Sequence, residues 1–296
     1  MFIKQALQKA TGQLKKGSIK NPALEAEILL SHILKKDREF LFTYPEKELT
    51  NNQASYYKRL TSRRLKGEPV AYLTGQKEFY GLNFFVNKNV LIPRPETELM
   101  VEEALDLIVH NKKRMTLIDV GTGSGCIIIS LAKQLDLRIK NYDLRMLGVD
   151  ISEKVLSVAK KNAELHGVNR KIKFVHGDLL KPALLNSKFI NHNSKMIILA
   201  NLPYLTPTQI KSSPTVKYEP EKALDGGRDG LKYYKELFRQ ARQLKSLNPV
   251  SFSILCEIDP AQAGKIKKLA QSELPKNEIK IKKDLSGRNR LAIIEI

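Results

Sequence analysis

The longer part of the chain alternates short apolar runs with longer segments in which apolar residues recur at helical spacing. Runs joined in this way predict a parallel sheet covered by helices, because parallel strands need a crossover connection between them. We expect strands at residues 116–120, 145–150, 171–176, 196–200, 251–258, 278–283 and 290–296.

The last two runs differ from the others in how they are joined. Only Asp284-Leu285-Ser286-Gly287-Arg288-Asn289 separates them, which is too short for a helix and predicts an antiparallel hairpin. The fold class is therefore α/β, with a mostly parallel seven-stranded sheet that ends in an antiparallel hairpin. We assign residues 91–296 to this domain.

The first 70 residues predict a small helical domain instead. Helical spacing of apolar residues extends from Ile3 to Leu14, a second helix is expected from Asn21-Pro22 to Leu34, and a third at residues 51–65. Residues 71–90, rich in aromatic residues and glycine, predict a hairpin or extended connector. A length of 296 residues agrees with two domains.

One apolar run leads directly into a glycine loop and then a helical segment. The run at 116–120 contains Asp119 and is followed by Gly121-Thr122-Gly123-Ser124-Gly125. Glycines allow a tight turn, and the following helix N-terminus offers free N–H groups to a ligand. The spacing G-x-G-x-G differs from the dinucleotide fingerprint G-x-G-x-x-G. An acid before the first glycine suits a cationic ligand such as S-adenosylmethionine better than a pyrophosphate.

The next two predicted strands each lead to an acidic residue at or just after their carboxyl ends. Asp150 ends the run at 145–150, a position from which an acid accepts hydrogen bonds from ribose hydroxyls in folds of this kind. Asp178 and Leu179 follow the run at 171–176 and are placed to meet an adenine edge through a carboxylate and a backbone amide. Ser152 is a good N-cap for the helix after Asp150.

The run at 196–200 ends in a segment suited to holding a planar NH2 group. Asn201 offers a side-chain oxygen and Leu202 a backbone carbonyl, so together they can accept both N–H groups. Pro203 favours an extended Leu202, which turns that carbonyl out of the loop, and Tyr204 can lie against a flat substrate. These four residues, 201–204, are called the clamp below.

The charge and the residue composition limit the possible partners, location and cofactors of the protein. The net charge is +20 and is spread over both parts of the chain, which suits RNA-associated or ribosome-associated partners but also a lysine-rich proteome. The two cysteines lie in apolar stretches and fit a reducing cytoplasm, where we place the protein. The histidines lack metal-ligand spacing, so no metal site is expected. No signal peptide and no membrane-spanning run is expected.

Several longer motifs resemble one enzyme family over nearly the whole chain. They are Gly67-Glu68-Pro69-Val70-Ala71-Tyr72-Leu73-Thr74-Gly75, Phe79-Tyr80-Gly81, Val90-Leu91-Ile92-Pro93-Arg94-Pro95-Glu96-Thr97-Glu98, Tyr218-Glu219-Pro220 and Asp284-Leu285-Ser286-Gly287-Arg288-Asn289-Arg290. With the clamp they resemble the glutamine-N5 methyltransferases of peptide chain release factors, the HemK or PrmC type. These are class I enzymes that use S-adenosylmethionine. The family clamp usually reads Asn-Pro-Pro-Tyr, so Leu202 is a departure that removes some preorganisation of the loop.

The resemblance implies an activity, a substrate and a set of roles. The expected reaction is methyl transfer to the glutamine of the Gly-Gly-Gln loop of a release factor, with the cofactor on the glycine loop. The N-terminal domain is expected to recognise the body of the substrate, while Arg94 and Glu96 either shape the mouth of the site or cap the helix that begins at Pro95. A monomer without a stable nucleic-acid complex is expected.

Three alternatives stay open at this point. A sister enzyme methylates a glutamine of a ribosomal protein, although residues 93–98 favour the release-factor type. Asn-Leu-Pro-Tyr also resembles the clamp of the rRNA adenine N6-dimethyltransferases, which the basic charge supports and the N-terminal helical domain opposes. A catalytically inactive scaffold that binds the cofactor is the third.

Overall fold

The computed structural model describes residues 1–110, 114–138, 144–186, 195–213, 216–247 and 251–296. The chain divides into two compact units. The smaller comprises residues 1–76 with Val216–Tyr218, and the larger comprises residues 77–213 and 219–296. The division falls at Gln76, within the segment predicted as a hairpin or connector.

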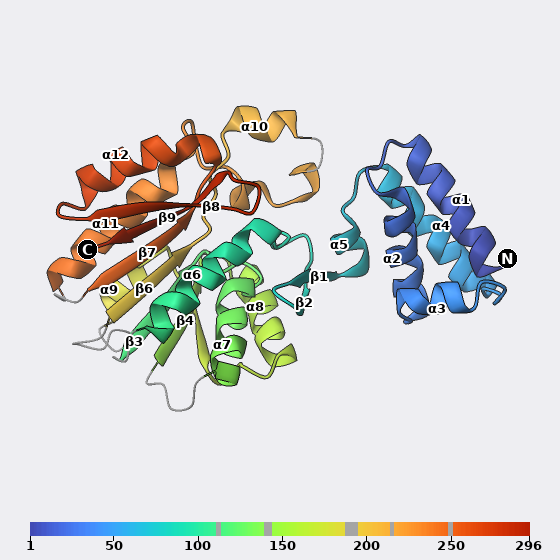
Figure 1. The fold of residues 1–296 in the computed structure, drawn as a ribbon, viewed down its shortest axis with the longest axis horizontal. Helices are drawn as coiled ribbons and strands as arrows, with labels where there is room; N and C mark the ends of the chain where they lie inside the picture. Colours follow the sequence, from blue (N-terminus) through green and yellow to red (C-terminus); the bar gives the residue numbers. More distant parts are fainter. Residues whose placement is uncertain (111–113, 139–143, 187–194, 214–215, 248–250) are drawn as a thin grey trace. The chain divides into compact units, whose positions relative to one another are not determined.

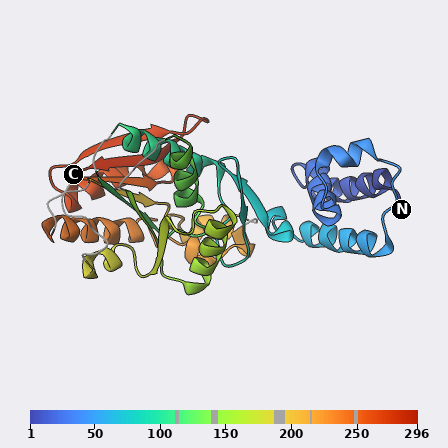
Figure 2. The same cartoon turned by 90° about the horizontal axis from the view of Figure 1, so that it is seen from below.

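The smaller unit is helical, as the sequence predicts. Its helices are drawn in blue and cyan in Figures 1 and 2 and are α1 (Ile3–Lys16), α2 (Pro22–Leu34), α3 (Arg38–Thr43), α4 (Asn51–Leu65) and α5 (Val70–Thr74). The one-sided spacing of α1 buries Ile3, Ala6, Ala10 and Leu14 in the core of this unit. The short helices α3 and α5 were not predicted, because each is too brief to show a period.

Helix α2 begins where Asn21-Pro22 predicts, but without the capping hydrogen bond that an asparagine at this position ordinarily makes. Asn21 holds the N-cap position and Pro22 the first turn, but the Asn21 side chain makes no capping hydrogen bond. Pro22, whose fixed φ suits a first helical turn, is therefore the local feature that favours this start. Thr50 does cap α4, where its hydroxyl accepts a hydrogen bond from the Gln53 N–H at 3.2 Å.

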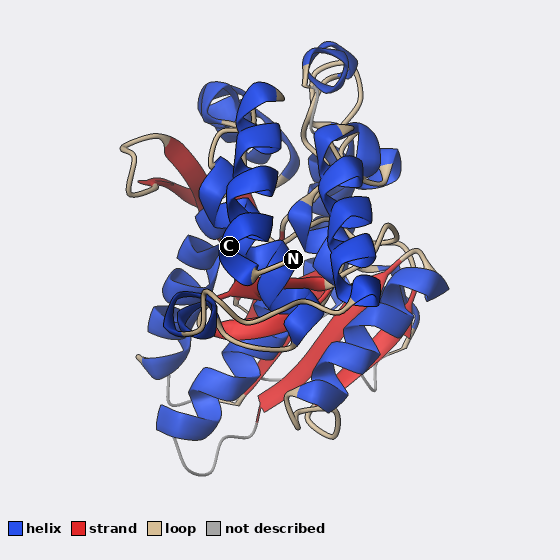
Figure 3. Cartoon of the chain, turned by 90° about the vertical axis from the view of Figure 1, so that its right-hand side faces the viewer, coloured by secondary structure: helices blue, strands red, loops and turns tan. Residues whose placement is uncertain are grey.

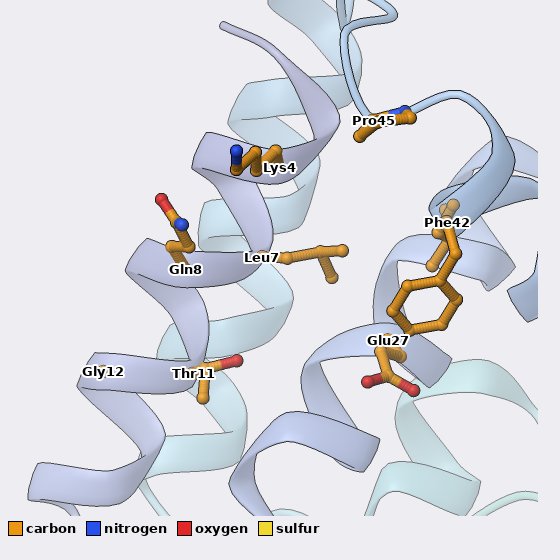
Figure 4. A pocket seen from close by; sticks show the side chains of 9 residues that line it. Lys4, Leu7, Gln8, Thr11, Gly12, Glu27, Phe42 and Pro45 are labelled. Carbon is orange, nitrogen blue, oxygen red and sulfur yellow. The ribbon is translucent and has the colours of Figure 1, made fainter.

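A pocket of about 620 Å³ lies on the smaller unit. Figure 4 shows its wall, with Leu7 of α1 and Phe42 of α3 projecting toward one another across it. Phe42 is 61% exposed, which is unusual for a phenylalanine and leaves an apolar surface open to contact. Lys4 and Glu27 also line the pocket, and Glu27 is paired with Arg38.

The larger unit is built on a seven-stranded sheet in the described part of the chain, with the order β5-β4-β3-β6-β7-β9-β8. Every predicted strand is present, with ends shifted by no more than a residue or two. The strands are β3 (Met115–Val120), β4 (Leu144–Asp150), β5 (Ile172–His176), β6 (Lys195–Ala200), β7 (Phe252–Glu257), β8 (Glu278–Lys283) and β9 (Asn289–Glu295). Strands β3 to β7 pair in parallel, and β9 pairs antiparallel with both β7 and β8.

Helices cover both faces of this sheet, as Figures 1 and 3 show. The helices of this unit are α6 (Glu98–Val109), α7 (Cys126–Arg138), α8 (Glu153–Leu165), α9 (Lys181–Leu185), α10 (Pro207–Ser212), α11 (Lys232–Leu247) and α12 (Ala263–Glu273). One core joins α6 and α7 to alternate residues of β3 such as Leu117, and the other joins α11 and α12 to residues such as Ile118. The fold is α/β with both faces of the sheet covered, which explains why the central strands β3, β6 and β7 are continuous apolar runs.

The hairpin of β1 (Gln76–Phe79) and β2 (Leu82–Phe85) lies within residues 71–90, where a hairpin or extended connector was predicted, whereas residues 71–74 belong to α5. Phe79 and Phe84 are buried in the core that contains α6 and α7. Asn162 of α8 joins the hairpin to the glycine loop, because its Nδ2 donates to the Phe85 carbonyl at 3.0 Å and to the Ser124 carbonyl at 2.9 Å. The hairpin is thus a support for the site that the next section describes.

Candidate active site

The strand order places two predicted loops next to each other at one edge of the sheet. Strand β3 lies between β4 and β6, so the chain runs outward from β3 in opposite directions. The glycine loop follows β3 and the clamp follows β6, so both lie at the carboxyl edge of the sheet, where such a switch point forms a ligand site in α/β folds. Residues 80 positions apart in sequence thereby become neighbours.

The glycine loop adopts the conformation that its glycines allow. Gly121, Gly123 and Gly125 have positive φ values of 69°, 59° and 80°. A Cβ at Gly125 would stand 2.7 Å from Cδ1 of Ile129, so a side chain there would push the loop away from α7. The glycines therefore set both the turn and the close approach of the loop to its helix.

Asp119 and Asp150 hold this loop from two strands. The Thr122 hydroxyl donates to Oδ2 of Asp119 at 2.6 Å, and the Gly123 N–H donates to Oδ2 of Asp150 at 3.2 Å. Asp119 is 1% exposed, and burial raises its pKa to about 7. Burial also raises the pKa of Asp150, whose Oδ1 accepts from the Ser152 N–H at 3.0 Å. Ser152 caps α8 as predicted.

The predicted adenine contacts lie after β5. Asp178 is paired with Lys181, whose Nζ lies 2.7 Å from Oδ2. Leu179 has a positive φ of 53°, unusual for a leucine, and its side chain is buried in the core. This sharp turn sets the direction of the Leu179 amide, which is the group that the sequence interpretation assigned to the ligand.

Two residues to which the sequence analysis gave no role, Thr97 and Glu257, hold the clamp through hydrogen bonds. Asn201 donates through Nδ2 to Oγ1 of Thr97 at 3.1 Å, and Thr97 donates to Oε2 of Glu257 at 2.6 Å. The Tyr204 hydroxyl donates to Oε1 of the same carboxylate at 3.1 Å. Glu257 is 1% exposed at the carboxyl end of β7, where burial raises its pKa.

Leu202 joins the clamp to the glycine loop. Its side chain is 3% exposed and reaches the loop at Gly121. The Tyr234 hydroxyl of α11 lies 3.4 Å from the Leu202 carbonyl oxygen and nearer to the Glu257 carbonyl oxygen. A hydroxyl can donate only one hydrogen bond, so Tyr234 donates to the nearer Glu257 carbonyl. The Leu202 carbonyl oxygen therefore stays able to accept a hydrogen bond from a substrate.

Arg94 and Glu96 have different surroundings. Nη2 of Arg94 donates to Oε1 of Glu219 at 2.6 Å, and the other oxygen of Glu219 accepts from the Ile92 N–H at 3.2 Å. Arg94 therefore anchors the segment that follows the clamp. Glu96 is exposed in the short 3-10 turn Pro95–Thr97, and α6 begins after that turn at Glu98.

The sequence offers only weak indications of the supporting residues to which it gave no role. Thr97 lies inside the quoted motif at residues 93–98, and Glu257 is an acid at the end of an apolar run, as Asp150 is. Nothing local distinguishes Tyr234 or Asn162 from other residues of amphipathic helices. Cys126 packs in the core that contains α6 and α7, and burial raises the pKa of its thiol to about 12.

Two family models match the chain in the regions of the two units. The PrmC N-terminal domain matches residues 5–75, and a methyltransferase domain matches residues 111–278. The release factor glutamine methyltransferase of Bacillus anthracis is 33% identical over 301 residues and covers 100% of both chains. That of Clostridium acetobutylicum is 37% identical over 297 residues, which cover 99% of this chain and 98% of the relative.

This chain belongs to the release factor glutamine methyltransferase family. The curated relatives extend over both units, so the family includes the N-terminal helices as well as the sheet. The N-terminal domain of human METTL16 in complex with SAH has a TM-score of 0.51, with 18% identity and coverage of 90% of this chain and 93% of that one. At that identity the likeness concerns the fold, which is the class I methyltransferase fold predicted from the sequence.

Neither a metal-binding cluster nor a membrane-spanning helix is present among the described residues of this methyltransferase. No group of three or more histidine, cysteine or acidic side chains there is arranged to hold a metal ion. The helices in that part of the chain also lack the length and apolar character needed to cross a bilayer.

Proposed function

We propose that this chain transfers a methyl group from S-adenosylmethionine to the side-chain amide nitrogen of the glutamine in the Gly-Gly-Gln loop of a peptide chain release factor. The observation that carries this proposal is the orientation of Asn201. Its Nδ2 is used on Thr97, which leaves Oδ1 as the edge that can accept an N–H group. Relatives of this length named release factor glutamine methyltransferase support the substrate.

The residues around the glycine loop fit the methyl donor. Asp150 accepts backbone N–H groups of Gly123, Ile151 and Ser152, and a carboxylate has about four acceptor positions, so capacity remains for a ribose hydroxyl. A cationic ligand beside Asp119 would favour its ionised form, which burial alone disfavours. Asp178 and the Leu179 amide would meet the adenine. The donor supplies an electrophilic methyl on a sulfonium, and its neutral thioether leaves.

The clamp residues supply alignment. Oδ1 of Asn201 and the carbonyl of Leu202 accept the two N–H groups of the glutamine amide, while Tyr204 lies along its plane. With both N–H groups held, the nitrogen lone pair is directed at the methyl group, and the nitrogen loses one proton as the methyl group is added. Orientation of this kind is the main source of rate acceleration here.

The smaller unit is proposed to contact the body of the release factor. A single glutamine on an exposed loop offers little surface for specificity, whereas the pocket with Leu7 and Phe42 offers an open apolar surface. Arg94 would hold the segment after the clamp through Glu219, and Glu96 would add negative charge near Tyr204. A cytoplasmic location agrees with a release-factor substrate.

Mass spectrometry of the substrate tests this function. The purified protein and S-adenosylmethionine are incubated with unmodified release factor, with unmodified ribosomal proteins, and with naked small-subunit rRNA in separate tubes. We expect one methyl group on the glutamine of the Gly-Gly-Gln loop. Methylation of a ribosomal protein or of RNA alone would replace the proposal by one of the two alternative activities.

A further inference from the structure

Thr97 lies between the clamp amide and a buried carboxylate. Its Oγ1 is 3.1 Å from Nδ2 of Asn201 and 2.6 Å from Oε2 of Glu257. The hydrogen bonds from Thr97 and Tyr204 and the charge of Arg290 favour the ionised form of Glu257, against the effect of its burial. An ionised carboxylate only accepts hydrogen bonds, so the single hydroxyl proton of Thr97 is used on Glu257. The hydroxyl oxygen is then an acceptor toward Asn201, and only the NH2 edge of an amide can donate to it.

This arrangement decides which edge of Asn201 faces the substrate. The two edges of an asparagine amide are nearly identical in shape and opposite in hydrogen-bonding character, so the surrounding partners set the orientation. With Thr97 as an obligatory acceptor, Oδ1 points away from Thr97. In the opposite orientation the amide would offer N–H donors, which oppose a substrate NH2 and suit a carboxylate.

We propose that Thr97 and Glu257 are positioning residues that make the clamp select an amide NH2 over a carboxylate. The inference rests on the proposed function and extends it to residues outside the clamp. Glu257 acts through two branches, because its other oxygen accepts from the Tyr204 hydroxyl at 3.1 Å. One carboxylate therefore sets the orientation of two clamp residues.

A purely structural role for the Thr97 hydroxyl is a poor match to its contacts. Thr97 occupies the N-cap position of α6, where a threonine hydroxyl ordinarily accepts from a backbone N–H of the first turn, yet its side chain makes no capping bond. The hydroxyl is 2.6 Å from Glu257 instead. The charged neighbours of Glu257 are Arg290, which lies in β9 and pairs with Asp284, and Glu96.

The test compares Thr97→Val, which keeps the shape and removes the hydroxyl, with Thr97→Ser, which keeps the hydroxyl. The readouts are kcat and KM for the release factor, the Kd for S-adenosylhomocysteine, and the Ki of a release factor whose loop glutamine is replaced by glutamate. For Thr97→Val we expect kcat to fall about tenfold, as expected for the loss of a hydrogen bond coupled to a charged group. The Ki of the glutamate form should fall relative to KM, and Thr97→Ser should restore both values.

Two further variants make the result decisive. Thr61→Val removes a buried threonine hydroxyl in α4, whose bond is to the Tyr57 carbonyl, and should leave all four values unchanged. Glu257→Leu removes both acceptor oxygens, so the Thr97 hydroxyl can donate to Asn201 and selectivity should shift in the same direction as in Thr97→Val. This variant decides the question if Thr97→Val fails to fold.

The outcomes separate the inference from the function on which it rests. Wild-type protein that leaves the release factor unmethylated would contradict the proposed function. Active wild-type protein with an unchanged ratio of Ki to KM in the folded variants would overturn the positioning role, even if kcat fell.

Discussion

The Cδ2 atom of Leu202 lies 3.0 Å from the position that a Cβ atom on Gly121 would occupy. Gly121 begins the glycine loop after β3, and Leu202 is the second residue of the clamp after β6. The proposed cofactor loop and the proposed substrate clamp are thus in van der Waals contact at the switch point of the sheet. A substitution at Gly121 should therefore displace Leu202, and a substitution at Leu202 should alter the glycine loop.

Gly121→Ala should weaken cofactor binding. The added methyl group would press on Leu202, and a φ of 69° is strained for alanine. We expect the Kd for S-adenosylhomocysteine, measured by calorimetry, to rise by about tenfold, equivalent to roughly 1.4 kcal/mol. Gly264→Ala on α12, where nothing lies within 4 Å of the new methyl group, is the matched control and should bind as the wild type does. Equal affinity in Gly121→Ala would show that the contact is unimportant.

Asn201→Ala should reduce turnover much more than cofactor affinity. Without Oδ1 one N–H of the glutamine amide is no longer held, so the nitrogen is not aligned with the methyl group. Single-turnover methylation of the release factor should slow by about a hundredfold or more. The Kd for S-adenosylhomocysteine should change only a few-fold. A near-normal rate would remove Asn201 from the clamp.

The stability of the cofactor-free protein should fall as pH rises toward 7, in part because of Asp119. Its pKa is raised from 3.8 to about 7 in the fold, so between these values the folded form holds a proton that the unfolded chain has lost. The stabilisation is complete below pH 3.8 and is lost as pH rises through about 7. The contribution to the free energy of unfolding is at most about 4 kcal/mol.

Asp119→Asn checks this assignment. Asparagine keeps an acceptor oxygen for the Thr122 hydroxyl and does not titrate. Thermal unfolding midpoints of the cofactor-free proteins at pH 5 and pH 8 should differ less for Asp119→Asn than for the wild type. The same pH dependence in both proteins would assign the titration to other groups.

Phe42→Ala should raise the KM for the release factor and leave kcat unchanged. Phe42 is 61% exposed beside the pocket of the smaller unit, so its loss removes surface for contact without opening the core. We expect an increase of about fivefold to tenfold, the effect of losing an apolar contact worth roughly 1 kcal/mol or slightly more. Leu185→Ala, 87% exposed on α9, is the control and should have wild-type kinetics. An unchanged KM in Phe42→Ala would exclude this pocket as a contact surface.

The sequence by itself determined the strands, the fold class and the type of each proposed site residue. Strands buried on both faces are largely apolar, so the central strands β3, β6 and β7 could be located within a residue or two. Glycines with positive φ and the short turn before β9 are local features, and they appear where their letters indicate. The Asn-Leu-Pro-Tyr clamp was predicted for the same reason.

Only the tertiary structure decided how the clamp is supported. Thr97 precedes α6, Tyr204 follows β6 and Glu257 ends β7. The pairing of β6 with β7 and the packing of α6 against β7 bring the hydroxyls of Thr97 and Tyr204 to the Glu257 carboxylate. Hydrogen-bond direction depends on which donor meets which acceptor, and this has no trace in a linear pattern. The clamp residues are therefore visible in the sequence, whereas the edge of the Asn201 amide that faces the substrate is set by its neighbours in space.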